Sequence, residues 1–431
     1  MWKRLKDCCI LQPVPGKLNN HMPLAAIRLM LRPTSLALLV LFASCSSREP
    51  YTANQPESEV SGVMTLPDGS QETWRIVEEF RVGNETGNGA IFFGLVSAIT
   101  VDEYDQLLVL DRQASEVLVF DAKGELVRTI GGKGAGPGEF EHAVHIDVGP
   151  DGNLWVMEMR TGRLTLLDST GHYLRKEQLD IFGWDVGFVA DAYLGGFDWQ
   201  DRYNAAVEVP YSGEAGAQVT LGGNHLVLAR YSASLTPIDT VPMPHSPVRF
   251  EKYVHFAQNS VMIEDVPLQG EFHWRFAPGG NYWTLLTRPY EISEVSMSGD
   301  TLRTFAMPFD PVRVTDEDLQ EAHESLERFF ERGAELDLDK IPSTHPAANS
   351  FFVDEDGRIW VDKRAPSSED QHHLFDIIDA DGTLMGTLRS PFAVSPTPIP
   401  VIRHGFLYAV SAADDGSQLV IKARIDKSRS D

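Results

Sequence analysis

From Trp74 onward, short apolar runs alternate with clusters of turn-forming residues, and almost no stretch shows helical spacing. Five segments share one pattern, a turn followed by a bulky apolar pair, and they span residues 105–109, 152–156, 280–284, 357–361 and 405–409. Aspartate and glycine in such turns supply the positive φ that tight hairpins need. The pattern predicts an all-β protein built from antiparallel hairpins.

A second turn follows four of these segments, at Asp121–Gly124, Asp168–Gly171, Ser296–Gly299 and Asp379–Gly382. The 47 residues from Asp121 to Asp168 are typical of one propeller blade. Strands such as Leu107–Leu110 are apolar on both faces, which stacking of sheets around an axis explains better than a sandwich does. We predict a six-bladed β-propeller of four-stranded antiparallel blades over residues 74–426, or seven blades if the third region holds two.

The last repeat, residues 405–425, supplies about three strands, so we expect Trp74–Val82 to add the fourth and close the ring. Surplus length lies in residues 188–224 and 312–349. The second surplus contains a predicted helix, residues 315–332, inserted between blades 4 and 5. Thr315 and Asp318 have capping-box spacing, and one face carries Leu319, Ala322, Leu326, Phe329 and Phe330.

Residues 121–140 and 146–156, with the phrase Gly-Ala-Gly-Pro-Gly-Glu-Phe at 134–140, resemble the NHL-repeat class of six-bladed propellers. The resemblance is good over two blades and loose over three others, and the third blade along the chain hardly shows it. Ala143 and His145 stand where that class usually has Pro and Gly, and Glu158 stands where it usually has Asp. The resemblance implies a fold and little about activity.

The apolar run Leu36–Phe42 is too short to span a bilayer, which needs roughly 20 residues. Arg28 and Arg32 precede it and Ala43-Ser44-Cys45 follows, as in a secretory signal. The segment resembles a bacterial lipoprotein signal, although Phe42 stands where that class prefers Leu. The resemblance implies cleavage before Cys45 and acylation of its thiol, with a plain signal peptide as the alternative.

This interpretation divides the chain into a signal region (1–44), a lipidated cysteine with a flexible polar tether (45–73), the propeller (74–426) and a polar tail (427–431). A start at Met22 or Met30 gives a signal of conventional length, which would leave residues 1–21 untranslated. We expect an extracytoplasmic protein, anchored by lipid to the bacterial cell envelope at the outer membrane or the periplasmic face. Ser46 after the cysteine resembles an outer-membrane sorting signal.

The composition limits the classes of molecule that the protein can be expected to bind. The chain has 37 Lys and Arg against 62 Asp and Glu, a formal net charge of −25. That balance argues against nucleic acid as a partner and makes the lipid at Cys45 the expected link to the membrane. All three cysteines lie in the first 45 residues, so the rest of the chain has neither a disulfide framework nor a thiolate metal site.

Three histidines, His142, His255 and His345, each precede the first strand of a predicted blade. Such loops meet at one mouth of a propeller's central channel, where three imidazoles could hold Zn²⁺ or another divalent metal and activate a water. His145 and Asp147 could orient such a ligand. The alternative is that they are among thirteen histidines with ordinary structural roles.

Four aromatic residues fall near the same predicted loops: Trp184, Trp199, Tyr253 and Trp274. They could stack on a sugar or clasp a peptide, and packing between blades is the alternative. The glycine run Gly131–Gly138 matches no phosphate loop and is interpreted as a connection between blades. The acidic turns Asp354–Gly357 and Asp379–Gly382 do not fit a calcium loop and are interpreted as hairpin turns.

The sequence favours a binding module that recognises a peptide, a glycan or a partner protein through one face. The alternative is a metal-dependent hydrolase or lyase, similar to lactonase propellers, with its site at the channel mouth; this rests on fold analogy alone. A third hypothesis is a structural envelope protein that docks through the helix at 315–332. An enzyme needs convergent ligands or an acid–base pair at the channel, whereas a binder needs only shape and aromatic side chains.

Overall fold

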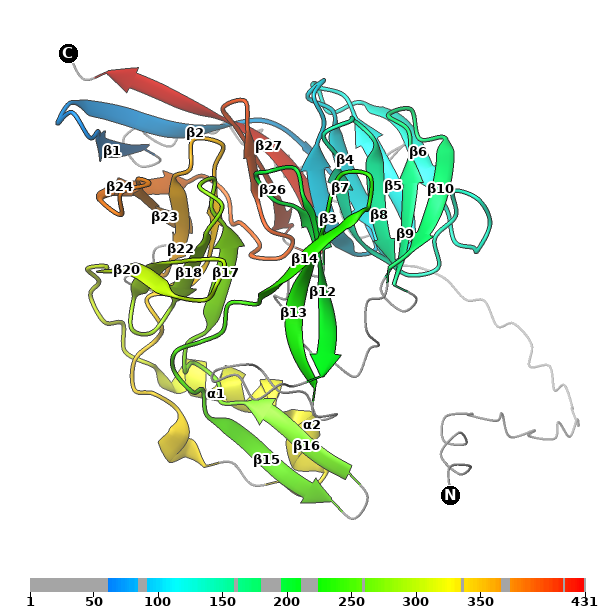
Figure 1. Cartoon of the computed structure of the whole chain (residues 1–431). Coiled ribbons are helices and arrows are strands. Elements are labelled where there is room, and N and C mark those ends of the chain that lie inside the picture. The colour runs from blue at the N-terminus through cyan, green and yellow to red at the C-terminus, as the bar shows by residue number, and fades with distance from the viewer. Residues whose placement is uncertain are drawn as a thin grey trace, which may run out of the picture. The chain divides into compact units, whose positions relative to one another are not determined.

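The computed structural model describes residues 61–83, 91–158, 162–179, 195–210, 224–257, 260–334, 337–365, 373–413 and 415–429 (Figure 1). These residues belong to one compact unit, residues 54–431. The predicted signal region, Cys45 and Trp184 lie outside the described residues. No helix in the described ranges is long and apolar enough to cross a membrane.

The first five blades are four-stranded antiparallel sheets whose strands follow one another in chain order. Blade 1 comprises β3 (Val96–Val101), β4 (Leu107–Asp111), β5 (Glu116–Phe120) and β6 (Leu126–Gly131). Blade 2 comprises β7 (Ala143–Val148), β8 (Leu154–Glu158), β9 (Arg163–Leu167) and β10 (Tyr173–Gln178). Blade 3 comprises β11 (Gly195–Phe197), β12 (Tyr203–Pro210), β13 (Asn224–Tyr231) and β14 (Pro237–Pro242).

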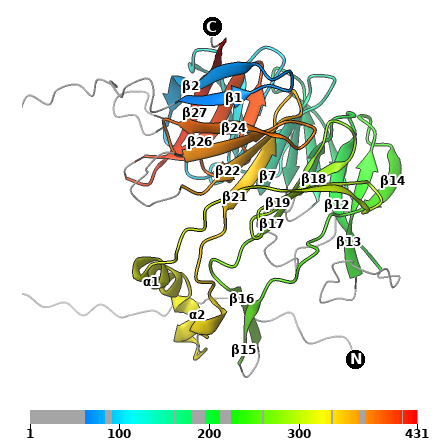
Figure 2. The ribbon, with the colours of Figure 1, turned by 90° about the vertical axis from the view of Figure 1, so that its left-hand side faces the viewer.

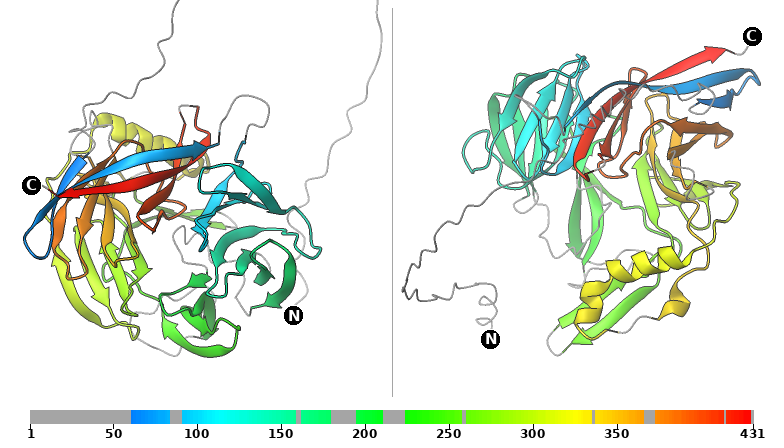
Figure 3. Two further views of the ribbon diagram at one scale, coloured as in Figure 1. Left: turned by 90° about the horizontal axis from the view of Figure 1, so that it is seen from above. Right: turned by 180° about the vertical axis from the view of Figure 1, so that it is seen from behind.

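Blade 4 comprises β17 (Phe272–Phe276), β18 (Tyr282–Leu286), β19 (Glu291–Val295) and β20 (Thr301–Ala306). Blade 5 comprises β21 (Ala348–Val353), β22 (Ile359–Lys363), β23 (His373–Ile378) and β24 (Leu384–Ser390). Seen from above, the sheets follow one another around an axis (Figure 3). The predicted six-bladed propeller with four-stranded antiparallel blades is confirmed.

Blade 6 is made from both ends of the chain. It contains β25 (Val401–Arg403), β26 (Phe406–Ala412) and β27 (Gln418–Arg429), and then β2 (Gln71–Val82) and β1 (Ser61–Thr65). β2 pairs antiparallel with β27, so the predicted closure by Trp74–Val82 is confirmed. Strands extend further than the sequence predicts, because β1 lies in the range assigned to the tether and β27 runs to Arg429 in the range assigned to the tail.

The turns explain why aspartate recurs between strands. Asp121 accepts the backbone N–H groups of Lys123 and Glu125, both at 2.9 Å. Asp354 and Asp379 each accept two N–H groups of their own turns in the same way. Their interpretation as hairpin turns is therefore confirmed, because the carboxylates satisfy local backbone donors.

The glycine run lies in the connection from β6 to β7, as predicted. Gly131 has φ +93°, and a Cβ at this position would lie 2.3 Å from the ring of Phe140. Phe140 is fully buried between blades 1 and 2. Glycine is thus needed here for packing and for a left-handed backbone.

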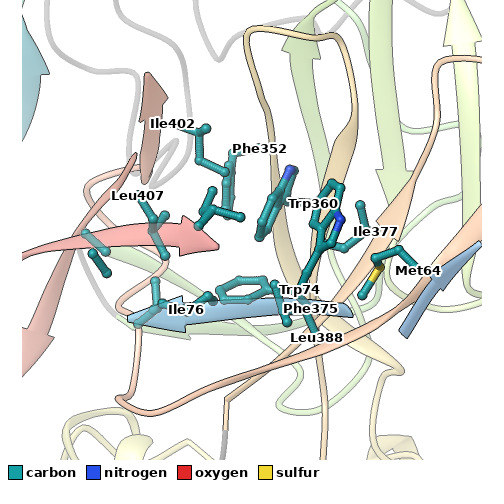
Figure 4. Close-up of a cluster of buried hydrophobic side chains, with 14 of the residues drawn as sticks. Met64, Trp74, Ile76, Phe352, Trp360, Phe375, Ile377, Leu388, Ile402 and Leu407 are labelled. Atoms are coloured by element: carbon teal, nitrogen blue, oxygen red, sulfur yellow. The ribbon is translucent and has the colours of Figure 1, made fainter. Parts of the chain in front are cut away.

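Between blades 5 and 6 lies a large buried cluster that joins the N-terminal strands to the C-terminal part of the ring (Figure 4). The rings of Trp74 and Trp360 lie 6.2 Å apart, and that of Phe352 stacks on Trp360 at 5.8 Å. Lys427 of β27 lies over the Trp74 ring at 4.3 Å. The closing strand therefore buries its one tryptophan against the neighbouring blade.

Two insertions interrupt the ring of blades. A hairpin of β15 (Lys252–Ala257) and β16 (Ser260–Asp265) lies between β14 and β17. Helices α1 (Asp316–Ser325) and α2 (Glu327–Glu331) and the short 3₁₀ helix Leu338–Lys340 lie between β20 and β21. The predicted helix and its insertion between blades 4 and 5 are confirmed, with a break at Leu326. The hairpin is an element that the sequence did not predict.

The two insertions pack against each other. Tyr253 and Val266 from the hairpin side are buried with Leu326, Phe329 and Ala334 from the helical side. The Tyr253 hydroxyl donates to the backbone oxygen of Asp337 at 2.8 Å. Figures 1 and 2 show the helices beside the hairpin, on one side of the blades. The insertions thus form a small unit with its own core.

We expect Trp74→Ala to lower the free energy of unfolding by about 3–5 kcal/mol, because it leaves a large cavity in a packed cluster. Phe256→Ala is the matched aromatic control, since Phe256 is 75 % exposed on the hairpin; we expect a change within about 0.5 kcal/mol. Urea unfolding followed by circular dichroism measures both. Equal losses in the two variants would contradict the closing role of Trp74.

Candidate functional site

A pocket of about 400 Å³ lies where the helical insertion joins blade 5. Its walls come from the connection between β20 and β21, the end of β22 and the start of β23. The lining residues are Pro308, Phe309, Asp310, Val312, His345, Pro346, Ala347, Lys363, Arg364 and Leu374. Because strands alternate in direction within a blade, this pocket lies at the propeller end that carries the connections between blades.

Backbone hydrogen bonds fix the walls of this pocket. The N–H of His345 donates to Val312 O at 2.8 Å. The N–H of Ala347 donates to Thr287 O at 3.0 Å, and that of Arg364 donates to Ala347 O at 2.9 Å. The connection is therefore tied to blades 4 and 5, which preorganises the residues that line the cavity.

His345 is the central polar residue of the pocket, and only 3 % of it is exposed. Its Nε2 lies 3.0 Å from Asp318 Oδ2. Its Nδ1 is buried and has no hydrogen-bond partner among the described residues. An ionised carboxylate can only accept, so this geometry assigns a proton to Nε2.

Asp318 has two roles. It is the third residue of α1, and it accepts the N–H of Thr315 at 2.7 Å in the predicted capping box. Burial opposes ionisation of this carboxyl, but hydrogen bonds from Thr315 and from His345 outweigh it and lower its pKa to about 2. Asp318 is therefore an anion near neutral pH, and it holds His345 in one orientation.

Lys363 and Arg364 add two cations to the wall. Lys363 Nζ lies 3.1 Å from Asp376 Oδ2, and Asp376 also accepts the hydroxyls of Tyr290 and Thr387. Burial, with the nearby Asp376 carboxylate, raises the pKa of Tyr290 well above its usual value, so this hydroxyl remains a donor. The fully buried carboxylate of Asp376 thus compensates the positive charge of Lys363.

Two of the three histidines predicted as metal ligands, His142 and His345, lie as expected in connections that lead to the first strand of a blade. His255 instead lies on β15 of the inserted hairpin, with its ring 6.1 Å from Phe329. No group of three or more His, Cys, Asp or Glu side chains that could hold a metal occurs in the described ranges. The structure therefore does not bring the three histidines together, and the metal site stays a prediction.

His145 and Asp147 lie on β7, the first strand of blade 2. Asp147 Oδ2 accepts the N–H of Phe197 on β11 at 2.8 Å, and its Oδ1 accepts the N–H of Val148. Burial raises the pKa of Asp147 to about 6 and lowers that of His145 to about 4. Asp147 thus links the first strands of blades 2 and 3, a role that the sequence did not indicate.

The candidate aromatic residues lie in different surroundings. Trp199 is 42 % exposed in the turn between β11 and β12, and its Nε1 donates to Phe276 O at 3.0 Å. Tyr253 belongs to the core of the insertions. Trp274 is buried against Tyr282, with ring centroids 5.4 Å apart. The structure brings none of these three into the pocket beside blade 5.

A family model described as a 6-bladed beta-propeller matches residues 88–209. A search of curated proteins finds no match. Among solved structures, a member of the duf4221 family from Bacteroides vulgatus has a TM-score of 0.47 and 10 % identity, covering 82 % of this chain and 99 % of that one.

Two enzymes are also among the similar structures. A catalytically inactive virginiamycin B lyase from Staphylococcus aureus has a TM-score of 0.38 and 11 % identity, covering 86 % of this chain and 97 % of that one. A gluconolactonase from Xanthomonas campestris has a TM-score of 0.39 and 11 % identity, covering 85 % and 95 %. Similarity at this level carries no argument about activity.

We predict that Asp147→Asn changes how stability depends on pH. A raised pKa means that the native state binds the proton more tightly than the unfolded chain, so Asp147 lowers stability as pH rises from about 4 to 6. His145, with its lowered pKa, acts in the opposite sense over the same window. In Asp147→Asn the free energy of unfolding should rise between pH 4 and 7, relative to wild type, by on the order of 1–2 kcal/mol.

Urea titrations at several pH values measure this difference. Asp201→Asn, an exposed aspartate in a turn of blade 3, is the control and should follow the wild-type curve. An Asp147→Asn curve parallel to that of the wild type would show that Asp147 keeps an ordinary carboxyl pKa.

Proposed function

We propose that this chain is an extracytoplasmic binding module that takes its ligand in the pocket beside blade 5. One observation carries the proposal: Arg364 lines a pocket of about 400 Å³, and its nearest carboxylate oxygen among the described residues lies 3.8 Å away, beyond a hydrogen bond. A guanidinium in this position has N–H donors left for a ligand. A ligand with a complementary group would accept them.

The composition of the walls supports a small-molecule or peptide site. Apolar groups from Phe309, Val312 and Leu374 surround a few polar ones, as is usual for ligand pockets, and the volume of about 400 Å³ is within their usual range. The ligand we propose is a peptide, a glycan or a segment of a partner protein that places one group in this cavity.

Anchoring to the membrane is part of the same proposal. The run Leu36–Phe42, the preceding arginines and Ala43-Ser44-Cys45 support a lipoprotein signal with acylation at Cys45. We place the protein at the bacterial cell envelope on these grounds. We also propose, from the likeness of their sequence, that residues 121–156 are related to NHL repeats.

We expect Val312→Trp to abolish ligand binding, because the larger side chain fills the pocket from its wall. The experiment screens residues 46–431, which leave out the proposed lipidated Cys45, against peptides, glycans and organic acids by thermal shift. Val248→Trp is the matched control, since Val248 is exposed and does not line the pocket, and it should retain every shift. Ligands that bind both variants equally would show that the binding site lies elsewhere. A screen without any thermal shift would overturn the proposed binding function.

The same preparation separates the enzyme alternative. A metal-dependent hydrolase or lyase would carry about one divalent metal per chain, and replacing His142 or His345 with alanine would remove it. Elemental mass spectrometry of the untagged protein measures this stoichiometry directly.

For the anchor, we expect Cys45→Ser to move the protein from the detergent-rich phase to the aqueous phase in a phase-partition assay of expressing cells. Ser47→Ala, two residues away, should leave partitioning unchanged. Detergent partitioning that survives Cys45→Ser would contradict lipid attachment at this residue.

A further inference from the structure

We infer that the pocket recognises a carboxylate group on an apolar body. This inference rests on the proposed binding function and specifies its ligand class. It is carried by the guanidinium of Arg364, which lines the pocket together with apolar side chains.

Two cations line the pocket, and they differ in their partners. Lys363 and Arg364 are lining residues, and Asp310 is the acidic one. Lys363 pairs with Asp376 at 3.1 Å, so its charge is compensated within the protein. Asp310 is exposed, so water screens its charge. Arg364 is therefore the residue whose charge favours an anionic ligand group.

Arg364 is the cation that a ligand can engage. Among the described residues, the nearest carboxylate oxygen is Asp318 Oδ1, at 3.8 Å from Arg364 Nη2. That separation exceeds a hydrogen bond, so the guanidinium fork is not used in a bidentate pair with Asp318. Lys363 differs, because Asp376 lies 3.1 Å from its ammonium group. A planar carboxylate can form with Arg364 the bidentate pair that Asp318 does not form.

His345 lies beside this fork, with its Nε2 3.3 Å from Arg364 Nη2. Asp318 lies 3.0 Å from the same nitrogen. These contacts hold the imidazole ring beside the guanidinium, so His345 positions Arg364 at the pocket. The ligand carboxylate would then accept hydrogen bonds from the Arg364 guanidinium.

The remaining walls describe the body of the ligand. Phe309, Val312, Pro346, Ala347 and Leu374 contribute apolar surface. A short aliphatic or branched chain fits these walls and gains affinity by leaving water. A free organic acid and the C-terminal residue of a peptide share this chemistry, and the experiment separates them.

The test compares hexanoate with hexanamide by isothermal titration calorimetry, using residues 46–431 at constant pH and salt. The two probes share their apolar body and differ in charge. We expect hexanoate to bind at least about tenfold more tightly, and we expect Arg364→Gln to remove this preference while leaving hexanamide affinity unchanged. Arg249→Gln, at an exposed position outside the pocket, should behave as wild type, and unchanged thermal midpoints confirm that both variants fold.

A second arm uses acetyl-Ala-Ala-Leu with a free or an amidated C-terminus. A preference for the free peptide that exceeds the preference for hexanoate identifies a peptide C-terminus as the source, and the reverse identifies a small organic acid. Equal affinity of hexanoate and hexanamide would overturn the carboxylate inference but leave the pocket as a binding site. No binding of either acid would overturn it as well, whereas the proposed function fails only if no ligand in the screen is sensitive to Val312→Trp.

Discussion

The pairing of β2 with β27 is the constraint on which the other blades depend. A propeller blade buries its faces against its neighbours, so an open ring would expose the flanks of blades 1 and 5. Ten register pairs join Glu72–Val82 to Val420–Arg429, and Trp74 fastens this seam to Trp360 of blade 5. On the other flank, Gln418 reaches the backbone N–H of Val96 at 2.6 Å, where blade 1 begins. The closing blade therefore connects both of its neighbours.

Because the ring is closed by other strands, the connections between blades can carry insertions. The hairpin β15–β16 and the helices α1 and α2 arise from successive connections at the same end, and they bury apolar residues against each other. Asp318 shows how such an insertion becomes part of a site: the residue that caps α1 also orients His345 in the wall of the pocket. Local helix chemistry thus positions a side chain of the propeller.

The repeated turns allowed the fold to be predicted, because Asp and Gly at fixed spacing dictate hairpins and a regular period dictates blades. The inserted helix could also be predicted, because the capping-box spacing of Thr315 and Asp318 marks where it begins. The hairpin β15–β16 was not, because its alternating residues read like blade strands. The pocket depends on Asp318 meeting His345 and Arg364 across separate elements, which no local pattern reveals. His345 was predicted as a metal ligand from its position alone. Its contacts with Asp318 and Arg364 come from elements that lie apart in the sequence.

Ring closure has a consequence for the order of events in the cell. The pairing of β2 with β27 joins residues more than three hundred positions apart in the chain, so blade 6 cannot be completed until translation has almost finished. Contacts of such long sequence separation form slowly. Until β27 has been made, the ring stays open, and the flanks of blades 1 and 5 that blade 6 covers in the finished protein remain exposed.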